Sequence, residues 1–356
     1  MKPIFKLRTL GLFAIGVLAA GGALGQQDIK LTIGSHAGTT LVPVATMKNY
    51  YQAEVNRLLQ TGGNKYKVTW NEAYGGTLFK FSETLSAVKD GLADVGYVGT
   101  VWEADRMPLS GITFFTPFSS TSMKVQANAV DNLVRNNKAV ADEWERNNLV
   151  YLAPIVVENY DLWTSFPVGK LDDLKGRKLM APGTAARWLQ GTGAVAVDGG
   201  LPAFYTNIQT GVADGAVSLH SAMMGMKIFE VAKHVTETGI GSMVPGALAV
   251  NRDRFRKLPK EVQDALVKAA SGYSDRVIQE TELKIADARK ALDAQGSKVQ
   301  TLPEAERKRW IASLPDIGGD WIKLVEAKGQ PARQVMQAYM AEVRKAGEKP
   351  GRDWDR

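Results

Sequence analysis

The chain has 356 residues, of which 45% are hydrophobic and 23% are charged. This is the composition of a globular protein, which excludes a mostly disordered chain, and the length suits roughly two domains. Because cysteine is absent, disulfides, thiolate metal sites and cysteine nucleophiles are excluded. The chain has only three histidines, so we expect no zinc site and no cofactor, although carboxylates could bind Ca²⁺ or Mg²⁺.

The first residues have the pattern of a secretory signal peptide. Lys2, Lys6 and Arg8 precede the uncharged stretch 10–24, and small residues end it at Gly25. The apolar run is shorter than the roughly 20 residues that a membrane-spanning helix needs. We therefore predict a leader over residues 1–25, a periplasmic location, and a mature protein that is not embedded in the membrane.

Without the leader the formal net charge falls from +7 to +4, since the leader contains three basic and no acidic residues. The remaining basic residues alternate with acids, as in Arg252-Asp253-Arg254. Interleaved charge is typical of solvated helix faces and not of a nucleic-acid footprint. We expect no nucleic-acid partner.

Strand and helix patterns alternate through the first hundred residues. Alternating polarity predicts strands over 28–34 and 65–72, and a short buried strand over 92–98. Helical spacing predicts helices over 43–60 and 79–90. This alternation indicates an α/β fold with mainly parallel sheet.

The rest of the chain continues the pattern and ends in helices. Residues 259–295 have helical periodicity with only Gly272 as a weak interruption, a length that could span two lobes. The tail 348–356 is expected to be frayed. The other predicted elements are a helix over 122–147, a strand over 149–157, a turn and strand over 171–180, helices near 184–191 and 202–210, and an amphipathic helical region over 303–347.

A short internal repeat suggests two similar halves. Residues 88–96 and 209–217 both follow a predicted helix and both contain Gly-x-Ala-Asp. A glycine at a helix end followed by a short strand is a common device in α/β units, although so short a match also arises by chance. The repeat is consistent with two α/β lobes that face each other.

No catalytic motif supports an enzyme. The loop 34–38 (GSHAG) contains a serine beside His36, but the chain has no Gly-x-Ser-x-Gly elbow, Walker A motif or His-Glu-x-x-His motif. Loops at the carboxyl ends of strands in open α/β sheets bind ligands, so we interpret this loop as a ligand contact. Five aromatic residues at or near predicted strand ends are either cleft lining or core: Tyr97, Trp102, Tyr160, Trp163 and Trp188.

Several segments together resemble the DctP family of substrate-binding proteins of TRAP (tripartite ATP-independent periplasmic) transporters. They occur in the family's order between about residues 30 and 295. The segments are 74–78 (YGGTL), 87–94 (AVKDGLAD), 171–179 (LDDLKGRKL), 204–215 (FYTNIQTGVADG), 229–235 (FEVAKHV) and 258–263 (LPKEVQ).

The resemblance implies a two-lobed periplasmic-binding-protein fold with a ligand cleft between the lobes and a long helix spanning both. We assign residues 26–152 and about 241–283 to the first lobe, and 153–240 and about 284–356 to the second. It also implies a non-enzymatic role in transport: capture of a small solute by hinge closure, and delivery to TRAP membrane subunits.

This chain departs from the family pattern at positions that contact the ligand. The family arginine that pairs with the ligand carboxylate corresponds to Met180, and a further basic residue falls near Tyr160. The family asparagine corresponds to Ser218, an early-loop contact falls at His36, and a site aromatic falls near Leu201. The bidentate arginine clamp is therefore absent, and methionine cannot replace it.

Two interpretations of the pocket follow. In the first, the ligand is still an organic acid whose carboxylate is bound by His36, Lys80, Arg187 or backbone amides. In the second, the ligand is neutral or amphipathic and is held by Tyr160, Trp163, Met180, Leu201 and Ser218. We expect Tyr97, Thr100 and Trp102 to contribute from the first lobe, whichever ligand is bound.

We favour an aromatic or otherwise bulky organic acid. Three further functions remain open: the binding protein of an ATP-driven (ABC-type) importer, a sensory receptor subunit and a secreted hydrolase.

Overall fold

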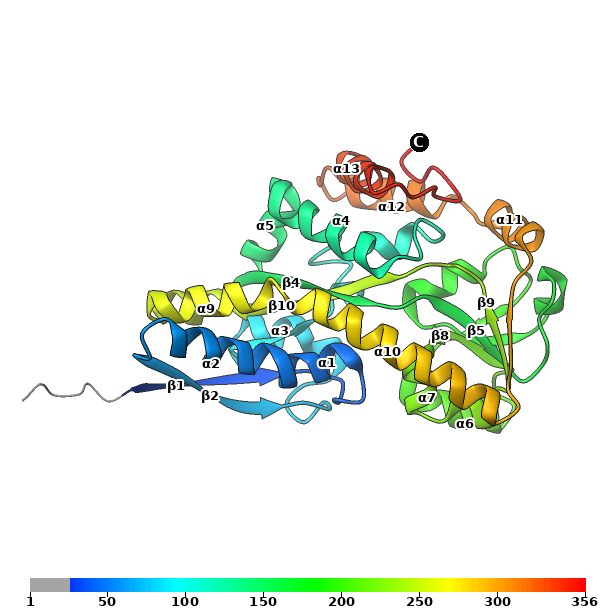
Figure 1. Ribbon diagram of the computed structural model, residues 1–356. Coiled ribbons are helices and arrows are strands. Elements are labelled where there is room, and N and C mark those ends of the chain that lie inside the picture. The colour runs from blue at the N-terminus through cyan, green and yellow to red at the C-terminus, as the bar shows by residue number, and fades with distance from the viewer. Residues whose placement is uncertain (1–25) are drawn as a thin grey trace, which may run out of the picture.

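Two β-sheets, joined by long strands and one long helix, organise the chain (Figure 1). The computed structural model describes residues 26–356, and the leader predicted over residues 1–25 lies outside them. One sheet has five strands in the order β2-β1-β3-β10-β4, and the other has six in the order β11-β9-β5-β8-β6-β7. We call the halves built on them the first and the second lobe. The strands are β1 (Gln27–Gly34), β2 (Tyr66–Ala73), β3 (Val95–Val98), β4 (Leu149–Val157), β5 (Tyr160–Thr164), β6 (Lys178–Met180), β7 (Val195–Val197), β8 (Gly215–Leu219), β9 (His234–Glu237), β10 (Met243–Asn251) and β11 (Lys298–Thr301).

Helices cover both sheets, as the alternating pattern predicts. In the part of the chain that the structure describes, no helix is both long and apolar enough to cross a bilayer. The α-helices are α1 (Val42–Thr46), α2 (Gln52–Thr61), α3 (Thr84–Lys89), α4 (Met123–Asn136), α5 (Lys138–Arg146), α6 (Phe204–Gln209), α7 (His220–Gly225), α8 (Arg252–Lys257), α9 (Lys260–Ala270), α10 (Tyr273–Ala294), α11 (Glu304–Ser313), α12 (Ile317–Glu326) and α13 (Ala332–Lys345).

The sheets are mixed: five of the nine strand pairs in the described residues are parallel, as predicted, and four are antiparallel. β1 pairs in parallel with β2 and β3, whereas β10 runs antiparallel to both β3 and β4. In the second lobe, β5 runs antiparallel to β8 and β9. The antiparallel strands are the ones that enter a sheet from the other lobe, so their direction follows from the crossing of the chain.

The chain crosses between the lobes along two neighbouring paths. β4 ends at Val157 and β5 begins at Tyr160, while β9 ends at Glu237 and β10 begins at Met243. Since β4 pairs with β10 and β5 with β9, the two crossing segments run side by side. This arrangement makes the segment between paired strands the natural hinge.

The long helix α10 is a third connection. Its 22 residues extend about 33 Å at 1.5 Å per residue, and it contacts β4 of the first lobe and α7 of the second. The continuous periodicity of 259–295 is divided at Gly272, where a Cβ would collide with the Tyr50 hydroxyl. A larger residue at this position would displace the Tyr50 side chain.

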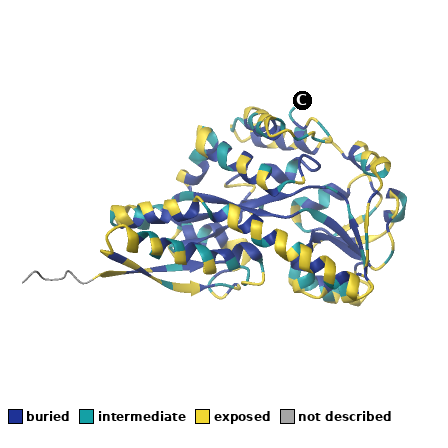
Figure 2. Cartoon of the chain, in the orientation of Figure 1, coloured by how far each residue is buried: buried dark blue, intermediate teal, exposed yellow. Residues whose placement is uncertain are grey.

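Each lobe has its own buried face of strand residues (Figure 2). Alternate residues of β5 point to opposite faces of the sheet. Leu162 joins the main core, whereas Trp163 joins a separate apolar cluster with Met180 and Phe204. The second lobe thus packs apolar side chains on both faces of its sheet.

The C-terminal segment packs tightly, and the expectation of a frayed tail over 348–356 is wrong. Trp354 is 1% exposed and its indole N–H donates to the Pro117 carbonyl at 2.9 Å. The helix α13 packs on α4, which contacts β4 of the first sheet. We therefore propose that residues 317–356 belong with the first lobe, although the sequence places them with the second.

Replacing Trp354 tests whether the tail is structural. We expect Trp354→Ala to lower the free energy of unfolding by about 3–5 kcal/mol, because it leaves a cavity and removes a buried hydrogen bond. Urea unfolding followed by circular dichroism measures this change. Arg356→Ala, at an exposed neighbouring position, is the control. Equal stability of the two variants would mean that the tail is frayed in solution.

Candidate functional site

Aromatic rings gather where two strands of the first sheet end. His36 follows β1, and its ring lies 4.9 Å from the ring of Tyr97 and 4.9 Å from that of Trp102, both edge-to-face. Phe81, which the sequence analysis missed, has its ring centroid 5.6 Å from that of Trp102. Because β1 and β3 are parallel neighbours, their carboxyl ends meet at one edge of the sheet, where open α/β folds bind ligands.

His36 is an electrically neutral member of this group near pH 7. Burial lowers the pKa of its imidazole from 6.5 to about 4. Within residues 26–356 its Nδ1 atom is buried without a hydrogen-bond partner. A neutral imidazole can exchange a hydrogen bond with a ligand, but it supplies no positive charge to a carboxylate.

Lys80 is the cation nearest to the His36 loop. Its Nζ donates to the Gly76 carbonyl at 2.7 Å. A Cβ built on Gly76 would lie 3.6 Å from that Nζ and 3.2 Å from the His36 carbonyl oxygen. The ammonium group therefore lies close to the loop, although one of its three donors is already used.

The hydroxyl groups of Thr100 and Tyr97 are in different environments. The Thr100 hydroxyl is buried and donates to the Ser110 carbonyl at 3.1 Å. Its donor is therefore used within the protein and is not available to a ligand. Burial raises the pKa of Tyr97, and the nearby phenol of Tyr160 raises it further.

A second aromatic group lies on the other side of the lobe junction. The ring of Trp188 lies 5.1 Å from that of Tyr160 and stacks on Phe114 at 5.6 Å. Its indole N–H donates to the Phe114 carbonyl at 2.9 Å. Phe114, which the sequence analysis missed, lies in the 3-10 segment Ile112–Phe115 of the first lobe, so this contact connects the lobes.

Arg187 precedes Trp188 and is the second cation among the predicted residues. It is half-buried, and within the described chain its guanidinium has neither an ion-pair nor a side-chain hydrogen-bond partner. A partly desolvated guanidinium without a carboxylate is uncommon in a protein interior.

The residues predicted to hold a neutral ligand do not form one surface. Tyr160 faces Phe114 and Trp188, whereas Trp163 and Met180 are 0% exposed inside the apolar cluster on the other face of the sheet. Leu201 is half-buried and packs against both groups of apolar residues. Ser218 is 2% exposed on the strand next to β5. The alternation of side chains along β5 explains this separation.

Buried acids, which the sequence analysis also missed, lie at the hinge. Asp161 receives a hydrogen bond from the Thr238 amide at 2.7 Å and contacts His220 Nε2 at 3.0 Å. Glu158 accepts from the Ser221 amide at 2.6 Å. The signal in the sequence was Asp161, an acidic residue among the apolar residues of β5.

The Glu158 and Asp161 carboxylates line a pocket of about 500 Å³ together with Arg289 and Arg307. In the region that the structure covers, no three His, Asp or Glu side chains are placed to hold a metal ion.

Comparison with known families identifies the class of protein. The model of bacterial extracellular solute-binding protein family 7 (DctP) matches residues 60–318. This chain therefore belongs to the DctP family of solute-binding proteins.

Curated relatives match over part of their length. A C4-dicarboxylate-binding periplasmic protein DctP of Rhodobacter capsulatus is 30% identical over 127 residues, which is 35% of this chain and 37% of that protein. A solute-binding protein of Verminephrobacter eiseniae is 26% identical over 155 residues, 44% of this chain and 45% of that protein. The chain thus spans less than half the length of these relatives in the matched regions.

Solved structures share the two-lobed fold over almost the whole chain. A TRAP solute-binding protein of Rhodoferax ferrireducens with copurified benzoate has a TM-score of 0.78 at 19% identity, covering 90% of this chain and 98% of that one. A marine metagenome TRAP protein specific for aromatic acid ligands has a TM-score of 0.77 at 19% identity, covering 89% and 99%. A protein of Bordetella bronchiseptica with bound mandelate has a TM-score of 0.73 at 23% identity, covering 89% and 99%.

Substitutions of Met180 distinguish a core position from a ligand contact. We expect Met180→Leu to change the free energy of unfolding by less than about 1.5 kcal/mol, because the volume is nearly conserved. Met180→Arg should lower it by several kcal/mol, because it buries an unpaired charge in an apolar cluster. Urea unfolding of both variants measures this difference. Equal stability of Met180→Arg and the parent protein would show that the side chain reaches solvent or ligand space.

The lowered pKa of His36 predicts an acid-sensitive fold. The unfolded chain binds this proton below about pH 6.5, whereas the folded chain binds it only near pH 4. Stability should therefore be complete above pH 6.5 and fall by about 3 kcal/mol as the pH drops towards 4, at about 1.4 kcal/mol per pH unit. Urea unfolding at several pH values, with His36→Gln beside the parent, measures this loss. A slope that His36→Gln leaves unchanged would contradict the assignment, and His234→Gln, at a less buried histidine, is the control.

Proposed function

We propose that this protein is the periplasmic component of a TRAP transporter that captures a small organic acid, with an aromatic or bulky acid favoured. The observation that carries the proposal is the pair of aromatic groups at the lobe junction. His36, Tyr97 and Trp102 come from the first lobe, and Tyr160 and Trp188 come from the second. Trp102 is the most exposed of these rings at 39%, whereas Tyr97 and Trp188 are buried beneath the surface. Flat rings stack favourably on such surfaces, and each aromatic pair adds about 0.5–1.5 kcal/mol beyond area burial.

Arg187 and Lys80 are the proposed partners of the ligand carboxylate. They are the cations among the predicted residues, since His36 is neutral near pH 7 and Met180 carries no charge. A charge-assisted hydrogen bond to a carboxylate is about twice as strong as a neutral one. The neighbours that bind benzoate, mandelate and aromatic acids support an acid as ligand.

In the proposed mechanism, the lobes close around the ligand by bending at the paired crossing strands. Ligand contacts made by both lobes exist only in the closed state, so binding shifts the population towards closure. The closed form would then deliver the acid to the membrane subunits. No bond to the ligand is made or broken in this cycle.

One observation favours a second candidate, an amino-acid-like solute. Glu158 and Asp161 are buried carboxylates beside the hinge, 3% and 4% exposed. A ligand ammonium group would find acidic partners there while its carboxylate used Arg187. This chemistry also suits the binding protein of an ABC-type importer or of a sensory receptor.

A thermal-shift screen of residues 26–356 tests the proposal against benzoate, mandelate, succinate, amino acids and a neutral sugar. An aromatic acid at 100 times its Kd should stabilise the fold by roughly 2.7 kcal/mol. For the hit, we expect Arg187→Met and Trp102→Ala each to weaken binding at least roughly tenfold in calorimetry. Arg146→Met and Leu324→Ala, at exposed positions remote from the site, are the matched controls.

Stabilisation by amino acids alone would favour the second candidate. Unchanged affinity in Arg187→Met would remove this residue from the site and leave Lys80 as the predicted cation. Binding of neutral sugars with no response to any acid would contradict the proposed substrate class.

A further inference from the structure

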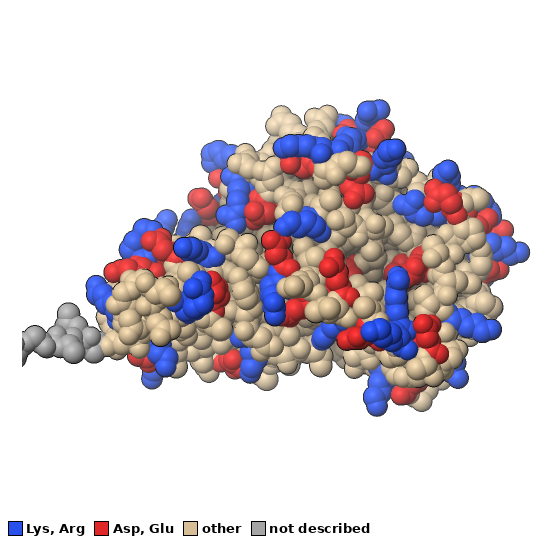
Figure 3. Space-filling view, viewed as in Figure 1, with Lys and Arg blue, Asp and Glu red and all other residues tan. Residues whose placement is uncertain are grey.

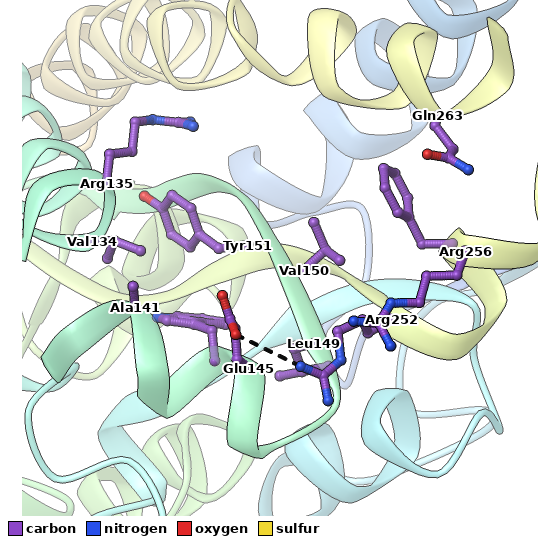
Figure 4. Close-up of a pocket in the computed structure, with 12 residues that line it drawn as sticks. Val134, Arg135, Ala141, Glu145, Leu149, Val150, Tyr151, Arg252, Arg256 and Gln263 are labelled. Atoms are coloured by element: carbon purple, nitrogen blue, oxygen red, sulfur yellow. Dashed lines mark ion pairs between the residues drawn. The ribbon is translucent and has the colours of Figure 1, made fainter. Parts of the chain in front are cut away.

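The first lobe contains a pocket that is not part of the proposed ligand cleft (Figure 4). It has a volume of about 470 Å³, which lies within the range of small-molecule sites. Its apolar lining comes from α4, α5, the start of β4 and α8. The lining includes Trp144, Glu145, Tyr151, Arg252, Phe255 and Arg256.

The pocket is separate from the cleft. It is lined by the first residues of β4, Leu149 to Tyr151, whereas the crossing to the second lobe begins at Val157. Six residues of extended strand span about 20 Å. No residue proposed for the cleft lines it.

The charge of the pocket is positive. In Figure 4, Arg135 lies on one side of the pocket, and Arg252 and Arg256 lie on the other. Arg135 Nε forms an ion pair with Asp131 Oδ2 at 2.8 Å. Among the described residues, the ion-pair partner of Arg252 is Glu145, at the longer Nη1–Oε2 distance of 3.9 Å. Within the described residues, no ion pair includes Arg256. Elsewhere, as on the face in Figure 3, basic and acidic side chains are interspersed.

Two buried donors at this pocket lack acceptors. In the chain from residue 26 to 356, the Trp144 indole Nε1 and the Arg252 Nε are buried without a hydrogen-bond partner. Trp144 is 3% exposed. A buried donor left unsatisfied costs about 1–3 kcal/mol, so a ligand that brings an acceptor would recover this energy.

We propose that this pocket is a second binding site, for a small amphipathic carboxylate that is distinct from the cleft ligand. The carboxylate binds between Arg252 and Arg256, where guanidinium groups favour planar bidentate anions. The apolar body of the ligand packs on Tyr151 and Phe255. The proposal does not depend on the proposed function, because it uses none of the cleft residues.

The test uses 4-fluorobenzoate as the probe, observed by fluorine NMR on the mature chain. We expect Arg256→Ala to weaken the second-site signal roughly tenfold, the loss of one charge-assisted contact. Glu145→Gln should strengthen it, because it removes the one acidic lining residue. Trp102→Ala should leave it unchanged. Arg146→Ala, an exposed arginine outside the pocket, is the control for charge alone.

A second readout locates the site. The indole N–H signal of Trp144, assigned by its loss in Trp144→Phe, should shift as the probe binds. The fluorine measurement on Arg256→Ala remains decisive if Trp144→Phe does not fold. Four outcomes overturn the proposal: one probe site that Trp102→Ala abolishes, equal affinity in Arg256→Ala and the parent, weaker binding in Glu145→Gln, or inorganic phosphate binding as tightly as the probe.

Discussion

The side-by-side crossing of two strand segments between the sheets is the constraint on which the rest of this structure depends. β4 pairs with β10 and β5 with β9, so both crossings run along the same line. Buried backbone groups at such a crossing must all be hydrogen-bonded, and the Asp161 carboxylate contributes by accepting from the Thr238 amide. The main apolar core is continuous across this crossing, because it includes residues of both sheets, such as Leu248 and Leu162.

Electrostatics at the lobe junction differ from those of the family pattern. Met180 packs in an apolar cluster, burial keeps His36 neutral near pH 7, and the buried acids Glu158 and Asp161 lie beside the crossing strands. A carboxylate brought into this environment needs a cation from elsewhere, since an unpaired buried charge is strongly unfavourable. The half-buried Arg187 is the cation that we propose for this role.

Much of the fold could be predicted from the sequence, because helices and strands have local patterns of polar and apolar residues. The alternation of strand and helix signals predicts an α/β protein, and the segment order predicts the DctP family, which the match over residues 60–318 confirms. Gly272 was visible in the sequence as a weak interruption of the helical stretch 259–295. The burial of Trp354 could not be predicted, because it depends on a contact with a residue distant in the chain, Pro117.

The candidate site could likewise be predicted from the sequence only in part. Polar and aromatic residues near the ends of predicted strands, such as His36, Trp102 and Tyr160, were visible in the sequence. The sequence by itself determined the class of protein, since hydrophobic period and motif order are local properties. Only the tertiary structure decided which side chains share a surface. Tyr160 and Trp163 are three residues apart yet face opposite sides of the sheet, whereas Phe114 and Trp188 meet across the lobes because separate chain segments pack there.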